Sequence, residues 1–346
     1  MAVDRKRIKV GAVMAGVVVV ALGAGIGTAD AGTRRSWWGA VKPAKTTSAP
    51  AASAAPGISP SVKVSLGASA TPTASRTASA SPAVSASGSP AASRTSATPK
   101  ATATTAGWAP PPAGAGVDYQ LGGAYTLPKG VTVVSRDREA KPAAGAYNVC
   151  YVNAFQAQPG DEAWWRKNHP DLLLRDKNGD LVVDEDWDEL MFDVSTEAKR
   201  TALTAIVGEW IDKCAADGFQ AIESDNLDSF TRSNGLLTQA QAVAFATALN
   251  GRAHANGLAS GQKNTAELGK AAAQRAGFDF AVAEECGEWD ECGTYAATYG
   301  DNVLVIEYTR DGFGRACDEF GDRLSIVLRD RDVSAPGSGT YVYEAC

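Results

Sequence analysis

A short apolar run turns acidic within the stretch Phe219-Gln220-Ala221-Ile222-Glu223-Ser224-Asp225-Asn226-Leu227-Asp228. Three of its carboxylates stand at positions i, i+2 and i+5, and Glu223 and Asp225 share the parity of one strand face. Carboxylates held close together at a strand end push each other's pKa values apart, as acid/base chemistry requires. The stretch therefore predicts a strand that ends in a cleft. The alternative is a turn of solvated acids in which Asp225 or Asp228 caps a helix.

Similar apolar runs recur along the chain and alternate with helical patterns. In residues 196–216, Ala202, Ile206 and Trp210 recur at i, i+4 and i+8, as the core-facing stripe of a helix does. Strands alternating with helices indicate parallel βαβ units. Eight runs in roughly 230 residues favour a closed (β/α)8 TIM barrel, a single catalytic domain, over an open doubly wound sheet. Besides residues 219–222, the runs are residues 131–134, 147–152, 190–192, 258–261, 278–283, 303–306 and 324–328.

The chain divides into three parts. Residues 1–32 have a basic start, an apolar segment at residues 11–26 and the A-x-A pattern Ala29-Asp30-Ala31, so they predict a signal peptide or signal anchor. The apolar segment is short for a spanning helix, which favours cleavage, and long for a signal peptide, which leaves an anchor open. Residues 33–116 are rich in Ala, Ser, Thr and Pro and predict a disordered linker, either a spacer or a passive connection. Residues 117–346 form the predicted barrel domain.

Charge separates at the same boundary. Residues 1–116 hold 12 Lys and Arg against 2 Asp and Glu, and residues 117–346 hold the other 21 against 37, a net charge of −16. Such an acidic domain argues against nucleic acid as a partner. It favours a neutral or cationic substrate, although solubility alone is an alternative reason for the charge.

All six cysteines lie in the acidic part, downstream of the export segment, and an even count there predicts disulfides. Metal binding is the rival interpretation, but the sequence has no C-x2-C pair and only two histidines, so we expect neither a metal site nor a cofactor. A pair between Cys286 and Cys292 closes a short loop, and a pair between Cys317 and Cys346 fixes the C-terminus. Cys150 and Cys214 are then paired by elimination.

Polar side chains gather where the apolar runs end. Active sites of barrels lie at the C-terminal ends of the strands, and acids, amides and aromatic residues at several of these ends suggest a sugar-binding cleft. The residues are Tyr151, Asn153, Asp193, Glu223, Asp225, Asn226, Asp228, Lys263, Asn264, Glu284, Glu285, Glu307 and Tyr308.

Several of these stretches, taken in order, resemble glycoside hydrolase family 114, the endo-α-1,4-polygalactosaminidases. The resemblance covers nearly all of residues 117–346. It implies an extracellular or cell-surface (β/α)8 hydrolase that acts on polymers rich in α-1,4-linked galactosamine, whose partly deacetylated and cationic chains suit a domain at −16. The matching stretches are Tyr119-Gln120-Leu121, Cys150-Tyr151-Val152, Trp187-Asp188-Glu189 with Asp193, Gly218-Phe219 with Glu223-Ser224-Asp225-Asn226-Leu227-Asp228, Ala253-His254, Gly257-Leu258, Lys263-Asn264, Phe278-Asp279-Phe280-Ala281-Val282 with Glu284-Glu285-Cys286, Glu291-Cys292 and Glu307-Tyr308.

The resemblance implies a catalytic pair, Asp225 and Glu284. We expect Asp225 to be the nucleophile and Glu284 the general acid/base of a retaining, endo-acting hydrolysis. The sequence departs from the family pattern at Ser224, where Pro is frequent, and at Ala283 and Glu285, where Asn and Gln are common, so Glu285 is an alternative acid. Glu284 shares a face with the bulky residues of its run, which favours Glu284 as the inward acid.

The remaining strand-end residues are expected substrate binders, each with an alternative role. Carboxylates would pair with amino groups, the tyrosines would stack on sugars, and Lys263 and Asn264 would bond to hydroxyls. Alternatively, Lys263 forms a structural salt bridge, Glu307 holds Lys263, and the tyrosines pack at the rim. The expected binders are Tyr151, Asp193, Glu223, Asn226, Asp228, Lys263, Asn264, Glu285, Glu307 and Tyr308.

Three alternatives remain at the level of the whole chain. One is a barrel glycosidase for another α-linked sugar, since a fold does not fix the substrate, another is a non-catalytic carbohydrate-binding module, and the third is an inert surface protein. Trp164, Trp165 and Trp187, near an acidic loop, form either an outer sugar platform or the packing of an excursion from the barrel. We expect a polysaccharide partner, an N-terminal membrane tether as one possibility, and a monomer.

Overall fold

The computed structural model of the chain describes residues 107–346. The predicted signal peptide or anchor, and the predicted linker as far as residue 106, lie outside the described residues. In residues 107–346 no helix has the length and apolar character needed to cross a membrane.

The folded part begins earlier than residue 117, the predicted boundary. The indole of Trp108 stacks on the imidazole of His254, with ring centroids 4.0 Å apart, and its Nε1 lies 3.3 Å from Asp279. The Tyr147 hydroxyl donates a hydrogen bond to the Ala109 carbonyl. These contacts attach residues 108–111 to the barrel. A tryptophan side chain can bury a large apolar surface, which the small side chains of the neighbouring Ala- and Pro-rich sequence cannot do.

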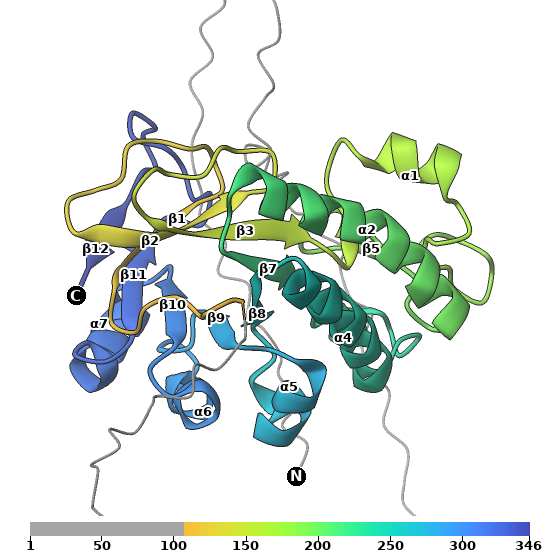
Figure 1. The fold of residues 1–346 in the computed structure, drawn as a ribbon. Coiled ribbons are helices and arrows are strands. Elements are labelled where there is room, and N and C mark those ends of the chain that lie inside the picture. The colour runs from red at the N-terminus through yellow and green to blue at the C-terminus, as the bar shows by residue number, and fades with distance from the viewer. Residues whose placement is uncertain (1–106) are drawn as a thin grey trace, which may run out of the picture. The chain divides into compact units, whose positions relative to one another are not determined.

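Eight parallel strands of the described residues form one sheet with an antiparallel ninth strand at its edge (Figure 1). This matches the predicted barrel. The spatial order is β1 (Gly116–Gln120), β2 (Val131–Asp137), β3 (Tyr147–Asn153), β7 (Ala221–Asp225), β8 (Ala259–Lys263), β9 (Phe280–Glu284), β10 (Val303–Glu307), β11 (Ser325–Arg329) and β12 (Tyr343–Ala345).

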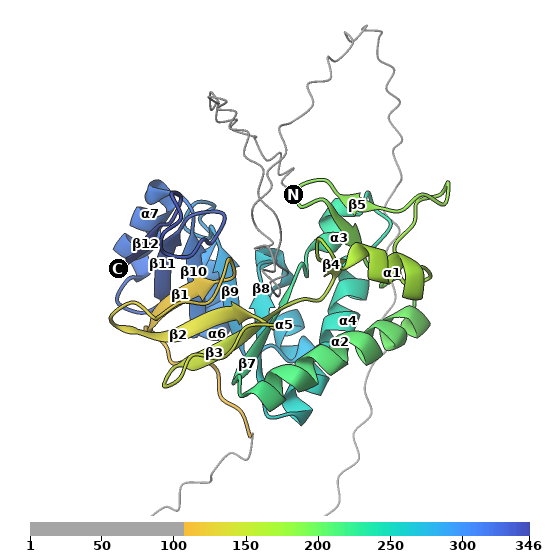
Figure 2. The same cartoon turned by 90° about the horizontal axis from the view of Figure 1, so that it is seen from above.

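Helices lie outside the strands from β3 onward (Figures 1 and 2). The longer helices begin at threonine caps: the side chains of Thr196, Thr238 and Thr309 each accept a hydrogen bond from a backbone N–H in the first turn. In the described chain, loops without a helix join β1 to β2 and β2 to β3. The helices are α2 (Glu197–Asp217), α3 (Ser229–Arg232), α4 (Gln239–Ala255), α5 (Lys270–Ala276), α6 (Cys292–Tyr299) and α7 (Arg310–Phe320), with a 3₁₀ turn, η1 (Ala266–Leu268).

An insertion between β3 and α2 forms a separate small sheet. It contains β4 (Gln156–Ala157), α1 (Glu162–Asn168), β5 (Val183–Asp184) and β6 (Glu189–Met191). Residues 190–192, predicted as the third barrel strand, instead pair antiparallel with β4 and β5. One barrel strand, β1, was not predicted. Its residues alternate between apolar and polar, so they form no apolar run, and they lie next to the predicted linker.

The barrel closes between β11 and β1 through a buried arginine. Arg329 has 1 % of its surface exposed, and its Nη1 donates to the Asp118 carboxylate at 2.9 Å and to the Tyr119 carbonyl. Its remaining nitrogens donate to the carbonyls of Val342 and Ser334, in the segment that leads into β12. This C-terminal segment therefore packs against Arg329 where the barrel closes and keeps its guanidinium buried.

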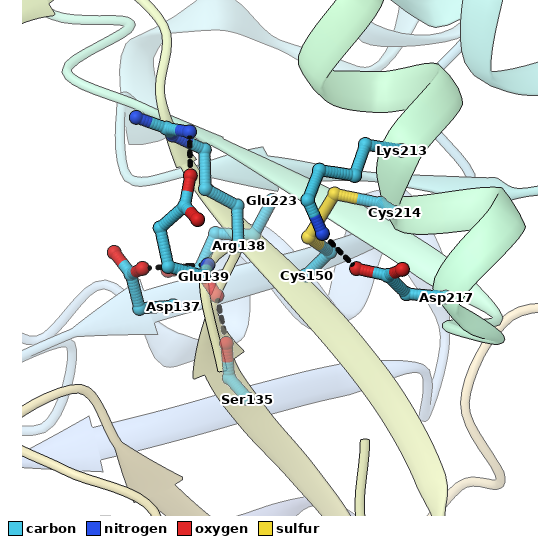
Figure 3. Close-up of a disulfide and its surroundings, with 9 residues drawn as sticks. All are labelled: Ser135, Asp137, Arg138, Glu139, Cys150, Lys213, Cys214, Asp217 and Glu223. Carbon is cyan, nitrogen blue, oxygen red and sulfur yellow. Dashed lines mark hydrogen bonds and ion pairs between the residues drawn. A yellow bond between two sulfur atoms is a disulfide. The ribbon is translucent and has the colours of Figure 1, made fainter. Parts of the chain in front are cut away.

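All three predicted disulfides are present. The Cys150–Cys214 bond links β3 to α2 (Figure 3), the Cys286–Cys292 bond closes the loop after β9, and the Cys317–Cys346 bond fastens the C-terminus to α7. The barrel interior is filled by side chains from alternate positions of the strands, including Val133, Val149 and Val282. At Gly261 an added Cβ would lie 2.8 Å from the Phe280 ring, so this interior position needs glycine.

Candidate active site

A buried lysine lies at the centre of the polar groups on the C-terminal ends of the strands. Lys263, the last residue of β8, has 2 % of its surface exposed. Its Nζ lies 2.9 Å from Asp225 Oδ1, 3.1 Å from Glu223 Oε1 and 3.3 Å from Glu284 Oε2. Neighbouring strands β7 and β9 supply these acids, so one ammonium group joins three carboxylates.

Asp225 and Glu284 occupy matching positions on either side of Lys263. Each is the last residue of its strand, and each accepts a 2.5 Å hydrogen bond from a tyrosine, Tyr151 for Asp225 and Tyr308 for Glu284. Their side chains are 15 % and 23 % exposed, whereas that of Lys263 is 2 % exposed. Both predicted catalytic carboxylates therefore contact one buried cation while part of each side chain stays exposed.

The distances to Lys263 limit how far apart the two carboxylates lie. Asp225 Oδ1 and Glu284 Oε2 are 2.9 and 3.3 Å from the same nitrogen, so the distance between these two oxygens cannot exceed the sum of the two. The two carboxylates therefore lie on either side of one ammonium group with one oxygen of each directed towards it.

Below Lys263, Glu223 forms the floor of the site inside the barrel. It has no exposed surface, accepts hydrogen bonds from the Tyr119 hydroxyl and, at 2.8 Å, from Ser135 Oγ, and contacts Lys263 (Figure 3 shows the Ser135 bond). The expectation that Glu223 pairs with substrate amino groups does not fit this burial. Its inward parity, shared with Asp225, is as predicted.

The direction of the pKa shift differs among the groups of the cluster. Burial alone would raise the pKa of Asp225, but the Lys263 ammonium and the Tyr151 hydrogen bond outweigh burial and lower it. Burial raises the pKa of Glu223, and Lys263 and Tyr119 offset only part of this. Burial would lower the pKa of Lys263, yet the surrounding carboxylates hold it well above its usual value. Lys263 is thus a permanent cation beside an ionised Asp225.

Asn264 positions the carboxyl group of Glu284, whereas the neighbouring Glu285 turns away from it. Asn264 binds Glu284 twice: its Nδ2 donates to Oε2 at 3.0 Å, and its Oδ1 accepts from the Glu284 backbone N–H at 2.8 Å. Glu285, the alternative acid, turns outward and pairs with Arg331, whose guanidinium lies 5.3 Å from the centroid of the Tyr308 ring. The structure thus brings Glu284, and not Glu285, to Lys263.

Four other expected binders lie away from Lys263. Glu307 faces the helix layer, where it is fully buried and accepts a 2.7 Å hydrogen bond from the Gly287 N–H, so neither contact with substrate nor contact with Lys263 fits. Its position follows from strand alternation, because Ile306 faces the interior. Asp193 accepts a hydrogen bond from the Ser195 N–H in the segment before α2 and binds Lys199.

Asn226 and Asp228 belong to a second polar cluster beside the site. Arg232 donates to Asn226 Oδ1 at 2.9 Å and lies 2.8 Å from Asp228 Oδ2. Asn226 also donates to Asn153 at 3.0 Å. The two residues fix the turn after β7, and Asn226 has a left-handed φ of 63°, which asparagine tolerates.

Sequence reasoning did not single out Glu189, the first residue of β6. It is 8 % exposed and accepts a 2.8 Å hydrogen bond from Asn153 at the end of β3. Burial raises its pKa to about 8, and Asp225 and Asp184 add to this, against the Asn153 hydrogen bond. Its motif was among the stretches that resemble the family, but the side chain reaches the site only because the insertion folds back.

The described residues contain one group with the spacing of metal ligands, formed by Cys286, Cys292 and Glu307. The two sulfurs form a disulfide, so they offer no thiolate to a metal ion.

Comparisons with known proteins agree with this architecture. The family model described as glycoside-hydrolase family GH114 matches residues 97–346. The crystal structure of Aspergillus fumigatus Ega3 in complex with galactosamine shares 24 % identity, covering 71 % of this chain and 100 % of that chain at a TM-score of 0.55. The glycoside hydrolase domain of PelA from Pseudomonas aeruginosa shares 15 %, covering 64 % and 97 % at a TM-score of 0.45. No curated protein matches the chain in sequence.

Proposed function

Since the family model spans residues 97–346, the chain belongs to glycoside hydrolase family GH114, and we propose that it is an endo-acting hydrolase of polysaccharides that contain α-1,4-linked galactosamine. One observation carries the proposal: Asp225 and Glu284 are both partly exposed and share the buried Lys263. A polymer with free amino groups is cationic and suits a domain with a net charge of −16 in residues 117–346. The solved relative Ega3, crystallised with galactosamine, supports the same class of sugar.

The proposed mechanism is a double displacement that retains the anomeric configuration. Glu284 donates its proton to the glycosidic oxygen while Asp225 attacks the anomeric carbon, so the leaving chain departs with a new hydroxyl group and a glycosyl ester forms on Asp225. Glu284 then removes a proton from water, and the hydroxide attacks the same carbon and releases Asp225. We choose retention because the two acids share one ammonium group, and retaining enzymes hold their carboxyl groups closer together than inverting enzymes do.

Different surroundings support different roles for the two acids. Lys263 and Tyr151 lower the pKa of Asp225 despite its burial, and a nucleophile must be ionised. Glu284 is the more exposed of the two, and its hydroxyl partner, Tyr308, can donate to the carboxylate or accept from the protonated acid. The same partner therefore serves both protonation states that the mechanism requires of Glu284.

Residues around the pair have supporting roles in the proposal. Lys263 is buried among carboxylates, so we assign it to charge balance rather than to sugar hydroxyls. Tyr151 and Tyr308 orient the two acids through their hydroxyls, and Asn264 holds Glu284.

We also propose an extracellular or cell-surface location, with the N-terminal segment as an export signal or tether and the domain acting as a monomer. Three disulfides favour an oxidising compartment. Polysaccharide is then the partner, and the acidic domain is poorly suited to nucleic acid.

The test uses the full chain and partly deacetylated galactosaminogalactan, with the release of reducing ends and the anomer of the first product followed by NMR. The wild type should release oligosaccharides of mixed length with the α-anomer first. Asp225→Asn and Glu284→Gln should each lose at least about a hundredfold in turnover, and the control Glu285→Gln should retain most activity. Near-normal turnover in both catalytic variants would reject the assignment, and binding without new reducing ends would favour a carbohydrate-binding module.

A further inference from the structure

Two connections of the barrel that lack a helix enclose a pocket on its outer side. Residues 121–130 join β1 to β2, and residues 138–146 join β2 to β3. The pocket between them has a volume of about 470 Å³, within the roughly 300–1,000 Å³ of small-molecule sites. We call it the Arg136 pocket. Its walls are mostly apolar and include Ala124, Leu127, Pro142, Ala143 and Ala144.

Arg136, on β2, is the one charged residue in the lining of this pocket, and it is 7 % exposed. Its Nε donates a hydrogen bond to Gln120 Oε1 at 3.0 Å, Nη1 to the Lys141 carbonyl at 2.7 Å and Nη2 to the Tyr125 carbonyl at 2.8 Å. A guanidinium group has five N–H donors. These three bonds therefore leave one N–H on each of Nη1 and Nη2 for a ligand.

The charge of Arg136 has no counter-ion of its own among residues 107–346. Its three acceptors are neutral, and the carboxylate that Gln120 contacts, Asp118, is already paired with Arg329 at 2.9 Å. Burial lowers the pKa of Arg136, and Asp118 offsets only part of this. A buried cation without a paired anion is costly. An anion in the pocket would therefore stabilise the folded chain at this point.

The remaining features of the pocket favour a carboxylate among anions. The planar guanidinium group matches the two oxygens of a carboxylate when two of its N–H groups are available. One cation balances one negative charge, and no acid lines the pocket although residues 117–346 carry a net charge of −16. The apolar walls suit a carbon body attached to the carboxylate.

We propose that the Arg136 pocket binds a small organic carboxylate, with the carboxylate on Arg136 and the carbon body against the apolar walls. The sheet separates this pocket from the candidate active site. Ser135 faces the barrel interior and donates to Glu223, whereas Arg136, the next residue, faces the outer side. The pocket is therefore a second site, and its ligand is chemically distinct from a cationic polymer. This inference goes beyond the proposed function and does not depend on it.

The binding test uses the full chain, titrated calorimetrically with 2-naphthoate and with 2-naphthamide, a neutral compound of the same shape. Naphthoate should bind at least about tenfold more tightly, because hydrogen bonds between two charged groups are stronger than those to a neutral group. Inorganic phosphate, an anion without a carbon body, should bind more weakly than naphthoate. Equal affinities for naphthoate and naphthamide, tighter binding of phosphate, or no binding of naphthoate would each refute the proposal.

Two variants and a control assign the binding to this pocket. Ala144→Phe fills the pocket from an exposed lining position, so it should abolish naphthoate binding while unfolding in urea and activity on the galactosamine polymer stay those of the wild type. Ala216→Phe is the matched control, because Ala216 is exposed on α2, outside the lining. Arg136→Lys keeps the charge but loses the planar group, so affinity for naphthoate should fall about tenfold. If this variant does not fold, Ala144→Phe decides, and unchanged naphthoate affinity in Ala144→Phe would overturn the assignment.

Discussion

Lys263 is the group whose removal tests the site most directly. Lys263→Met keeps a side chain of similar length and deletes the only cation that contacts Glu223, Asp225 and Glu284 in the described residues. The variant leaves three carboxylates together in a largely buried space. We expect a large loss of stability at neutral pH that shrinks as the solution is acidified.

The size of the effect follows from the distances. At the 2.9 Å between Lys263 Nζ and Asp225 Oδ1, two unit charges in an effective dielectric of about 20 attract by roughly 6 kcal/mol. Desolvation offsets part of that attraction, and the removal of one partner of a buried pair costs about 3–5 kcal/mol. We therefore expect Lys263→Met to lower the free energy of unfolding by about 3–5 kcal/mol at pH 7.

The sign of the pH dependence follows from the native-state protons. Lys263 lowers the pKa of Asp225, so the stability that this pair contributes is present above the unfolded pKa and is lost as pH falls through the lower folded pKa. In Lys263→Met the unpaired carboxylates bind protons more tightly than in the wild type. The difference in unfolding free energy between wild type and variant must therefore fall as the pH is lowered from 7 towards 4.

Urea unfolding followed by tryptophan fluorescence at pH 7 and pH 4 measures this difference. Lys213→Met is the matched control, because Lys213 pairs with Asp217 on the surface of α2 (Figure 3) and its loss should change little. A double variant, Lys263→Met with Glu223→Gln, should recover part of the lost stability, because one unpaired charge is removed. A cost that is equal at both pH values, or absent at pH 7, would refute the charge-balance role of Lys263.

Three further predictions concern other parts of the fold. Burial raises the pKa of Glu189 to about 8, so the stability that Glu189 contributes is present below its unfolded pKa and is lost as the pH rises through 8. The unfolding free energy of the wild type relative to Glu189→Gln should therefore fall between pH 5 and pH 8. A difference that does not change with pH would contradict the buried acid. In Asn264→Gly the glycine accepts the φ of 45°, and both hydrogen bonds to Glu284 are lost. The kcat should fall on the order of tenfold to a hundredfold with little change in KM. An unchanged kcat would show that Asn264 does not position the acid. Replacing both cysteines by alanine should lower the free energy of unfolding by about 4 kcal/mol for Cys150–Cys214 and by about 2 kcal/mol for Cys286–Cys292, because the closed loops differ in length, with separations of 64 and 6 residues. Urea unfolding measures both losses. The reverse order would show that loop entropy does not dominate.

Local patterns in the sequence were enough to predict much of this fold. The apolar runs of β7 to β11 are short, are separated by helical periodicity and end in polar residues, so their order and direction could be inferred. Parity correctly predicted that Glu223 and Asp225 share a face and that Glu284, not Glu285, points inward. The same rule applied to Glu307 would have placed it in the helix layer, since Ile306 lies in the interior.

Other features depend on contacts that no local pattern encodes. The short run at residues 190–192 is as apolar as a barrel strand, and only its antiparallel partners show that it belongs to the insertion. Strand β1 has polar Asp118 on its outward face, which becomes buried because Arg329 arrives from the far end of the chain. The position of Glu189 beside Asp225 depends in the same way on the return of the insertion to the barrel.

The hydrogen-bond capacity of Lys263 explains why two similar acids can act differently. An ammonium group has three N–H donors, and Lys263 forms hydrogen bonds with the Tyr119 hydroxyl at 3.0 Å, Glu223 at 3.1 Å and Asp225 at 2.9 Å. Glu284 Oε2 lies 3.3 Å from Nζ, close enough to interact with the positive charge, but the ammonium group has no fourth N–H to donate to it. Oε2 accepts a hydrogen bond from the neutral amide of Asn264 instead. Lys263 therefore holds Asp225 through a hydrogen bond and Glu284 through charge alone, at a longer distance. In the proposed mechanism Glu284 must lose and regain a proton in each cycle, which suits the acid that has no hydrogen bond to the ammonium group.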